Sequence, residues 1–262
     1  MKRKNLKVLL IVLILALFSI NYNFLNSEVE KFLNSEDTFH VERIIDGDTI
    51  VLKENETRVR LLGINTPERG EKYYEEAKVF LENKILNKTV SLEYGRDKTD
   101  LYGRTLSYVY FNSENINKKL VENGLANFYF PQGKDVHYDD FKDSWISCLN
   151  ENKNLCEKST NKCSSCIILE KFDHKSEETT FLNQCDFECN LDSWEIKDEG
   201  RKKFRFPKFS LKPHSKVSVI VGKGTDDKST LFWNRESYVW TNTGDTLFLR
   251  DSEGKLVLWN NY

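Results

Sequence analysis

Three short segments in the first half of the chain carry side chains suited to chemistry on a phosphodiester. They are residues 46–49 (Asp-Gly-Asp-Thr), residues 60–68 and residues 99–104. Each lies at the end of an apolar run, where a strand is expected to give way to a turn. A phosphodiester is an anion that repels nucleophiles, so its hydrolysis needs cations on the phosphate oxygens, a nucleophile made from water, and alignment of the two. Together the three segments supply such groups.

Two arginines and a glutamate are the candidates for binding the phosphate and activating the water. Arg60 and Arg104 suit the phosphate, because a guanidinium presents a planar fork of donors and stays protonated. Glu68 is the candidate base. A glutamate with an ordinary pKa of about 4.3 is ionised at neutral pH and accepts a proton from a water within hydrogen-bond reach.

Oxygen donors beside these residues predict a site for a hard divalent cation. The Asp48 carboxylate, the Asn65 amide and the Thr66 backbone carbonyl suit calcium or magnesium better than zinc. Such a cation polarises a phosphoryl oxygen further. Taken singly, each segment is also an ordinary turn or strand end. Their combination within one domain-sized stretch is what favours a site.

These motifs, in this order, resemble the staphylococcal-type nucleases, or thermonucleases. The resemblance covers residues 38–158. It rests on residues 45–49 (Ile-Asp-Gly-Asp-Thr), 60–68 (Arg-Leu-Leu-Gly-Ile-Asn-Thr-Pro-Glu), 99–104 (Thr-Asp-Leu-Tyr-Gly-Arg) and 121–126 (Val-Glu-Asn-Gly-Leu-Ala). It implies a calcium-dependent enzyme, with magnesium less favoured, that cleaves single- or double-stranded DNA and RNA with little sequence preference. Water would attack phosphorus and the 5′ oxygen would leave, giving 3′-phosphate ends.

The resemblance also implies a role for each candidate residue. Glu68 matches the general base of the family, and Arg60 and Arg104 match its two phosphate-binding arginines. Tyr102 matches a tyrosine beside the bound nucleotide. The positions that match the calcium ligands are Asp48, Asn65 and Thr66, the last through its backbone carbonyl.

Two departures from the family pattern bear on the site. Asn65 stands where the type enzyme has aspartate, which removes one formal charge from the metal site and predicts weaker calcium affinity. The stretch at residues 69–74 is shorter than the flexible loop of the type enzyme, so contacts of that loop with substrate do not carry over. The sequence therefore does not predict which nucleic-acid substrates are preferred.

The first half of the chain alternates strand and helix patterns. Apolar runs bounded by turn residues predict strands at 39–45, 49–53, 57–64, 88–94 and 104–111. Helical spacing predicts helices at 71–86, 116–123 and 136–150. The resemblance implies an α+β fold, an OB-type barrel with packed helices, whose face commonly binds oligonucleotides. Tyr129 is either a platform for a base or a packing residue between barrel and helix.

The second half resembles the lamin-tail domain, an all-β immunoglobulin-like sandwich, over residues 165–262. The resemblance rests on residues 190–198, 209–213 and 240–249, with Ser193 where glycine is usual. The partner of this domain is unknown; it would bind or position nucleic acid, a surface or a protein. Short alternating runs predict strands at residues 167–172, 179–183, 194–197, 203–206, 216–221, 237–240, 245–250 and 256–259.

The N-terminus has the pattern of an export segment. A basic start precedes an apolar run at residues 8–20, so residues 1–22 form either a signal peptide or an uncleaved membrane anchor. Both alternatives place the protein outside the cytoplasm, secreted or held at the cell surface.

The six cysteines all fall at or after residue 148. An even number of cysteines in an exported chain favours disulfides, although sequence does not choose among 15 connectivities. Structural zinc is the alternative, because residues 163–166 and 185–189 each hold a close cysteine pair. A polar stretch at residues 150–165 contains the expected linker, residues 159–164, between the two domains.

Charge limits the way in which the chain can bind nucleic acid. The formal net charge of -2 argues against a broad basic face, so contacts should be local to the site and weakened by salt. Two other functions stay open. One is a catalytically silent module that binds nucleic acid or protein, and the other is a structural protein of the cell surface, for which Glu68 would be irrelevant.

Overall fold

The computed structural model describes residues 38–262. The predicted signal peptide or anchor at residues 1–22 lies outside the described residues. Within residues 38–262, no helix has the length and apolarity that a membrane span requires.

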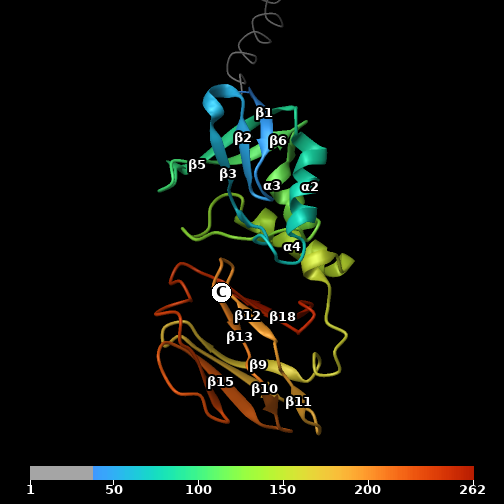
Figure 1. Ribbon diagram of the computed structural model, residues 1–262, viewed down its shortest axis with the longest axis vertical. Helices are drawn as coiled ribbons and strands as arrows, with labels where there is room; N and C mark the ends of the chain where they lie inside the picture. Colours follow the sequence, from blue (N-terminus) through green and yellow to red (C-terminus); the bar gives the residue numbers. More distant parts are fainter. Residues whose placement is uncertain (1–37) are drawn as a thin grey trace, which may run out of the picture. The chain divides into compact units, whose positions relative to one another are not determined.

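A closed five-stranded barrel forms the first half of the described chain (Figure 1). The pairs β1–β2, β2–β3 and β5–β6 are antiparallel, whereas β3 and β6 run parallel and close the barrel. The strands are rich in β-branched and aromatic residues, which suit a pleated, half-buried surface. The predicted OB-type barrel is confirmed. Its strands are β1 (Thr38–Ile44), β2 (Thr49–Leu52), β3 (Arg58–Leu61), β5 (Thr89–Thr99) and β6 (Thr105–Phe111).

Three helices pack with the barrel, close to the predicted positions. They are α2 (Tyr74–Ile85), α3 (Ile116–Glu122) and α4 (Tyr138–Glu151), and α3 contacts both of the others (Figure 1). Along α4, Tyr138, Phe141, Trp145 and Cys148 are buried at helical spacing. Minor elements complete this half: η1 (Glu54–Glu56), β4 (Ile64–Asn65), β7 (Glu114–Asn115), β8 (Asn127–Phe128) and η2 (Asn154–Cys156).

The second half is all-β, as predicted. One four-stranded sheet has the order β16-β15-β10-β9 and another the order β13-β12-β17-β18, while β11 pairs with β14. Ser193 has a φ of 63°, a left-handed conformation that accounts for the usual glycine at this turn. The strands are β9 (Ile167–Asp173), β10 (Glu178–Asn183), β11 (Cys189–Asn190), β12 (Glu195–Lys197), β13 (Lys203–Arg205), β14 (Ser210–Leu211), β15 (Lys216–Val221), β16 (Thr230–Trp233), β17 (Thr246–Arg250) and β18 (Leu256–Asn261).

One predicted strand, at residues 237–240, is wrong. This segment is irregular, and the strand of this region is β16, which pairs in parallel with β15. The reason lies in its hydrogen bonds. The backbone N–H groups of Val239 and Trp240 donate to the Glu177 carboxylate, at 2.8 Å and 3.2 Å. A side chain thus satisfies donors that would otherwise need a neighbouring strand.

The two halves share an apolar contact. Trp145 of α4 is fully buried, and its ring centroid lies 5.4 Å from that of Phe248 and 6.4 Å from that of Trp259. Arg250 donates from Nη1 to the Leu155 carbonyl at 2.7 Å. These contacts join α4 to strands β17 and β18, so helix and sheet hold each other in one packed core.

All six cysteines form disulfides, as predicted. The pairs are Cys148–Cys156, Cys163–Cys189 and Cys166–Cys185. The two close cysteine pairs that suggested zinc are cross-linked to each other, so their thiolates are not available as metal ligands.

Candidate active site

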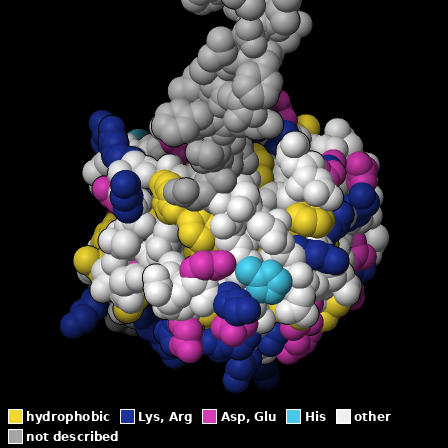
Figure 2. Space-filling view, turned by 90° about the horizontal axis from the view of Figure 1, so that it is seen from above, with side chains coloured by type: hydrophobic (Ala, Val, Ile, Leu, Met, Phe, Trp, Pro, Cys, Tyr) yellow, Lys and Arg dark blue, Asp and Glu magenta, His cyan; other side chains and the backbone are white. Residues whose placement is uncertain are grey.

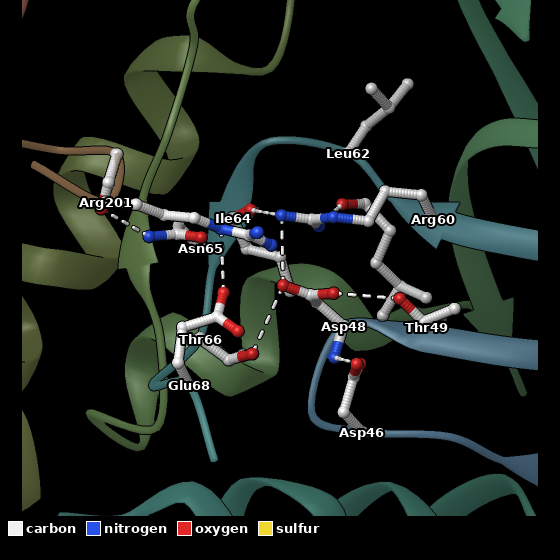
Figure 3. Close-up of polar contacts among 12 residues, drawn as sticks. Asp46, Asp48, Thr49, Arg60, Leu62, Ile64, Asn65, Thr66, Glu68 and Arg201 are labelled. Carbon is white, nitrogen blue, oxygen red and sulfur yellow. Dashed lines mark hydrogen bonds and ion pairs between the residues drawn. The ribbon is translucent and has the colours of Figure 1, made fainter. Parts of the chain in front are cut away.

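Asp48 lies at the centre of a buried polar cluster where β2 begins and β3 ends (Figure 3). Its Oδ2 pairs with Nη2 of Arg60 at 3.0 Å and accepts from the Thr66 hydroxyl at 3.2 Å. Its Oδ1 accepts from Thr49 at 3.0 Å. The preceding turn can approach α2 because Gly47 has no side chain; a Cβ there would lie 2.7 Å from that of Ala77. Packing against the helix thus fixes the direction of the Asp48 carboxylate.

Arg60 is held by several acceptors at once. Besides the ion pair with Asp48, Nη1 donates to the Leu61 carbonyl at 2.5 Å and Nη2 to the Ile64 carbonyl at 3.0 Å (Figure 3). Its side chain is only 9% exposed. The guanidinium is therefore well oriented, and much of its donor capacity is used within the protein.

Glu68 follows the strand end and is open to solvent. Its side chain is 48% exposed, and its Oε1 pairs with Nε of Arg201 at 2.7 Å (Figure 3). Arg201 belongs to the second half of the chain, in the turn between β12 and β13. Residues 198–202 are called the docking turn below. The candidate base of the first half is thus paired with a cation from the second.

Three donors of the first half hold the docking turn. Nδ2 of Asn65 donates to the Gly200 carbonyl at 2.7 Å, and Nδ2 of Asn127 donates to the Glu199 carbonyl at 2.8 Å. The backbone N–H of Phe130 donates to Oε1 of Glu199 at 3.1 Å. Asn65 and Asn127 are opposite each other in the β4–β8 pair. The short strand pair therefore presents two amides side by side to one turn.

Two carboxyl groups of the docking turn, those of Asp198 and Glu199, are buried together with that of Asp245, which precedes β17. Burial raises the pKa of Asp198 to about 7, and burial followed by the charge of Asp245 raises that of Glu199 to about 8. Burial also raises the pKa of Asp245, whose Oδ1 accepts from the Glu199 N–H at 3.1 Å. Desolvation lowers the pKa of the partly buried Lys197 to about 8. Removal from water thus weakens the charge of each group in this region.

The donor set is compatible with a hard divalent cation. Burial and the neighbouring Asp48 charge raise the pKa of Asp46, whose Oδ1 accepts from the Asp48 N–H at 3.1 Å. The Asn65 amide oxygen and the Thr66 carbonyl add neutral oxygen donors of the kind that calcium accepts. Residues 38–262 contain no group of three or more His, Cys, Asp or Glu side chains arranged for a metal. The oxygen donors are therefore of the type that calcium binds, but few of them carry a negative charge.

Arg104 and Tyr102 lie on an exposed turn that leads into β6. Nε of Arg104 pairs with Asp100 at 2.7 Å, and its guanidinium lies 5.5 Å from the Tyr102 ring centroid. Within residues 38–262, no hydrogen bond or ion pair links Arg104 to the Asp48 cluster. The parallel register aligns Arg60 with Leu106, so Arg104 lies two residues earlier on the adjacent strand. The Tyr102 side chain is 84% exposed.

Tyr129, by contrast, is partly buried and faces the docking turn. Burial raises its pKa, as do the charges of Asp198 and Glu199, while Arg60 lowers it. Its backbone N–H donates to the Gly63 carbonyl at 2.9 Å. This environment favours packing over base stacking, the two interpretations that the sequence allowed.

Comparison with known proteins agrees with this geometry. The family described as staphylococcal nuclease homologue matches residues 58–156, and the Lamin Tail Domain family matches residues 164–262. The thermonuclease of Staphylococcus intermedius is 34% identical over 145 residues, which cover 50% of this chain and 86% of that protein. The chain belongs to the staphylococcal nuclease family. Its barrel and helices are the nuclease domain, and the lamin-tail domain follows.

Other relatives support the same assignment. The thermonuclease of Staphylococcus hyicus is 34% identical over 147 residues, covering 50% of this chain and 86% of the relative. An uncharacterized endonuclease of Haemophilus influenzae is 35% identical over 106 residues, covering 39% of this chain and 58% of the relative. Both resemblances inferred from the sequence are thus confirmed, and family membership supports a nuclease function.

The structure brings together five of the residues singled out from the sequence: Asp48, Arg60, Asn65, Thr66 and Glu68. It adds Arg201 and Glu199, which sequence reasoning missed. Both lie in the lamin-tail domain, far along the chain. The sequence held one indirect sign of this contact: Asn65, whose side-chain N–H donates to the Gly200 carbonyl next to Arg201.

Proposed function

We propose that the chain is an exported, metal-dependent nuclease that hydrolyses phosphodiester bonds of DNA and RNA with little sequence preference. The observation that carries the proposal is the grouping of the Asp48–Arg60 ion pair with the solvent-accessible Glu68 at one edge of the barrel. Family membership supports it independently. The domains proposed are residues 38–158 and 165–262, joined by residues 159–164.

In this proposal Glu68 takes a proton from the attacking water. The water oxygen bonds to phosphorus, the bond from phosphorus to the 5′ oxygen breaks, and the departing 5′ oxygen takes a proton from solvent water. The product ends are 3′ phosphates. Arg60 and Arg104 stabilise the negative charge that gathers on the phosphate oxygens. An exposed carboxylate with room for water beside it suits this role, because a general base must reach the water that it activates.

The residues proposed to hold calcium are Asp48, Asn65 and the Thr66 carbonyl. A bound calcium ion would polarise a phosphoryl oxygen. Asn65 brings no charge, so affinity should be lower than with a second carboxylate. The Asp48 carboxylate also orients Arg60, so it serves the phosphate site as well as the metal site.

Substrate contact is proposed to be local. On the face shown in Figure 2, the described Lys and Arg side chains are intermixed with Asp and Glu. The net charge of -2 agrees with this pattern. Binding should therefore depend on a few phosphate contacts at the site and fall with added salt. The three disulfides favour an oxidising, extracytoplasmic location, secreted or at the cell surface.

The deciding experiment compares the full chain with Glu68→Gln. Cleavage of single-stranded DNA is measured with calcium, with magnesium and with a chelator. The variant is expected to lose about 100- to 10,000-fold in calcium-dependent rate, because it removes the base and keeps the shape. Equal rates would remove Glu68 as the base. DNA binding without any cleavage by the wild type would instead support a silent binding module.

A further inference from the structure

A cationic side chain of the lamin-tail domain lies beside the candidate base of the nuclease domain. Arg201 lies in the docking turn and places Nε 2.7 Å from Oε1 of Glu68 (Figure 3). Its side chain is 63% exposed. Within residues 38–262, no hydrogen bond of its two Nη atoms to the protein is observed. A planar fork of donors therefore faces solvent directly beside the candidate base.

Both candidate phosphate-binding arginines of the nuclease domain contact protein acceptors, Arg60 through its Nη atoms and Arg104 through Nε alone. Arg60 is buried and binds Asp48 and two backbone carbonyls. Arg104 is held through Nε by Asp100. Arg201 contacts Glu68 directly, and its Nη fork has no protein partner among residues 38–262. Such a fork is what bidentate recognition of a phosphate requires.

The position of Arg201 is fixed by its neighbours. Residues 198–200 are buried, although all three are polar or glycine. Asn65, Asn127 and the Phe130 N–H bind the carbonyls and the carboxyl group of this turn. An arginine on such a turn needs to order only its own side chain when it binds a ligand, which lowers the entropy lost on binding.

Asn65 has a direct part in this arrangement. Its Nδ2 donates to the Gly200 carbonyl, one residue before Arg201. An aspartate has no donor and would present an oxygen to that carbonyl. The amide at position 65 thus keeps an oxygen for the metal site and supplies the N–H that docks the second domain.

We propose that Arg201 binds a phosphate of the nucleic-acid substrate, so that the lamin-tail domain completes the phosphate-binding site of the nuclease domain. This inference rests on the proposed nuclease function. The Nε atom of Arg201 keeps its ion pair with Glu68, and its two Nη atoms donate to the phosphate oxygens. Arg201 therefore positions the phosphate relative to the base. The second domain is therefore part of the substrate site rather than an independent module.

The test compares cleavage by the full chain with Arg201→Ala, Arg201→Lys and Arg235→Ala. Arg235 is an exposed arginine of the lamin-tail domain that follows β16 and serves as the matched control. Arg201→Ala is expected to lower kcat/KM by about ten- to a hundredfold, since a hydrogen bond to a charged group is lost. Arg201→Lys should recover part of this loss, because it keeps the charge without the fork. Arg235→Ala should match the wild type.

A binding measurement distinguishes failure of this inference from failure of the nuclease function. Affinity for a fluorescent single-stranded DNA oligonucleotide is measured across a salt series, with Glu68→Gln as the parent to prevent cleavage. Adding Arg201→Ala should reduce the slope of log affinity against log salt by about 0.7, the value for one phosphate contact on a single strand. This readout works even if the wild type cleaves nothing.

An unchanged or raised kcat/KM in Arg201→Ala, with an unchanged salt slope, would overturn the proposal. A raised rate in particular would show that Arg201 blocks Glu68 instead of serving the substrate. Thermal unfolding of each variant is recorded alongside, and because Arg201 is exposed, all are expected to unfold near the wild-type temperature.

Discussion

Asn65 shows how a single side chain can serve two domains. Its amide nitrogen binds the Gly200 carbonyl at 2.7 Å, while the neighbouring Thr66 donates to Asp48. The family pattern has a carboxylate at this position, which would add charge to the metal site. In this chain the residue at this position instead makes a hydrogen bond between domains, so domain docking and the proposed metal site share Asn65.

Asn65→Asp is expected to destabilise the metal-free protein by about 1–3 kcal/mol, because the Gly200 carbonyl would lose the Asn65 donor, keep only its hydrogen bond from Lys197, and face a carboxylate oxygen. Chemical unfolding in the presence of a chelator measures the effect. Asn161→Asp is the control, since Asn161 uses only its side-chain oxygen, which accepts from the Cys163 N–H. A variant as stable as the wild type would show that the Asn65 amide does not hold the docking turn.

The docking turn is the element that joins the nuclease site to the second domain. It connects β12 to β13 and is closed by the Asp198 N–H, which donates to the Lys202 carbonyl at 3.2 Å. Its carboxyl groups lie against the nuclease domain and have raised pKa values. Protonation of these groups therefore contributes to docking.

Stability should fall as the pH rises from about 5 to about 8. The folded protein binds a proton at Glu199 with a pKa of about 8, above the ordinary 4.5. The stabilising contribution is complete below the unfolded-state pKa and is lost as the pH passes the folded-state pKa. Within this window one such group changes the free energy of unfolding by up to about 1.4 kcal/mol per pH unit.

Glu199→Gln is expected to flatten this dependence, because it keeps an acceptor for the Phe130 N–H and carries no charge. Urea unfolding from pH 5 to 9 measures it, with Glu188→Gln, an exposed glutamate of the same domain, as the control. Asp198 and Asp245 still titrate in the variant, so a reduced slope is expected rather than none. Identical slopes in the variant and the wild type would contradict the role of Glu199.

The described molecule is held together by a core that crosses the domain boundary. Trp145 of α4 packs on Phe248 and Trp259 of the lamin-tail domain, and Phe248 is itself buried. A nuclease domain without its partner would expose this apolar face to water, which is unfavourable. The two domains should therefore unfold together.

Phe248→Ala is expected to lower the free energy of unfolding by about 3–5 kcal/mol, the usual loss when a buried aromatic side chain is truncated. Calorimetry of the full chain measures this loss and shows whether unfolding stays a single transition. A chain limited to residues 38–158 serves as comparison and should melt at a lower temperature. Equal melting of the short and full chains would show that the nuclease domain does not depend on this contact.

The sequence by itself determined the local features of this protein. Apolar periodicity and turn residues predicted the barrel strands and the three helices, because these patterns act over a few residues. The residues of the first cluster, from Asp48 to Glu68, were predicted for the same reason: they lie within about 20 positions on adjacent strands. The strand at residues 237–240 was mispredicted because its hydrogen-bond acceptor, Glu177, is distant in the chain.

Only the tertiary structure decided the long-range pairs. It selected one disulfide connectivity among those that six cysteines allow, and it placed Arg201 beside Glu68 across more than half of the chain. No periodic pattern records such a contact, since it depends on the packing of α4 on β17 and β18. That packing sets the orientation of the lamin-tail domain, and the orientation in turn brings its docking turn to the nuclease site.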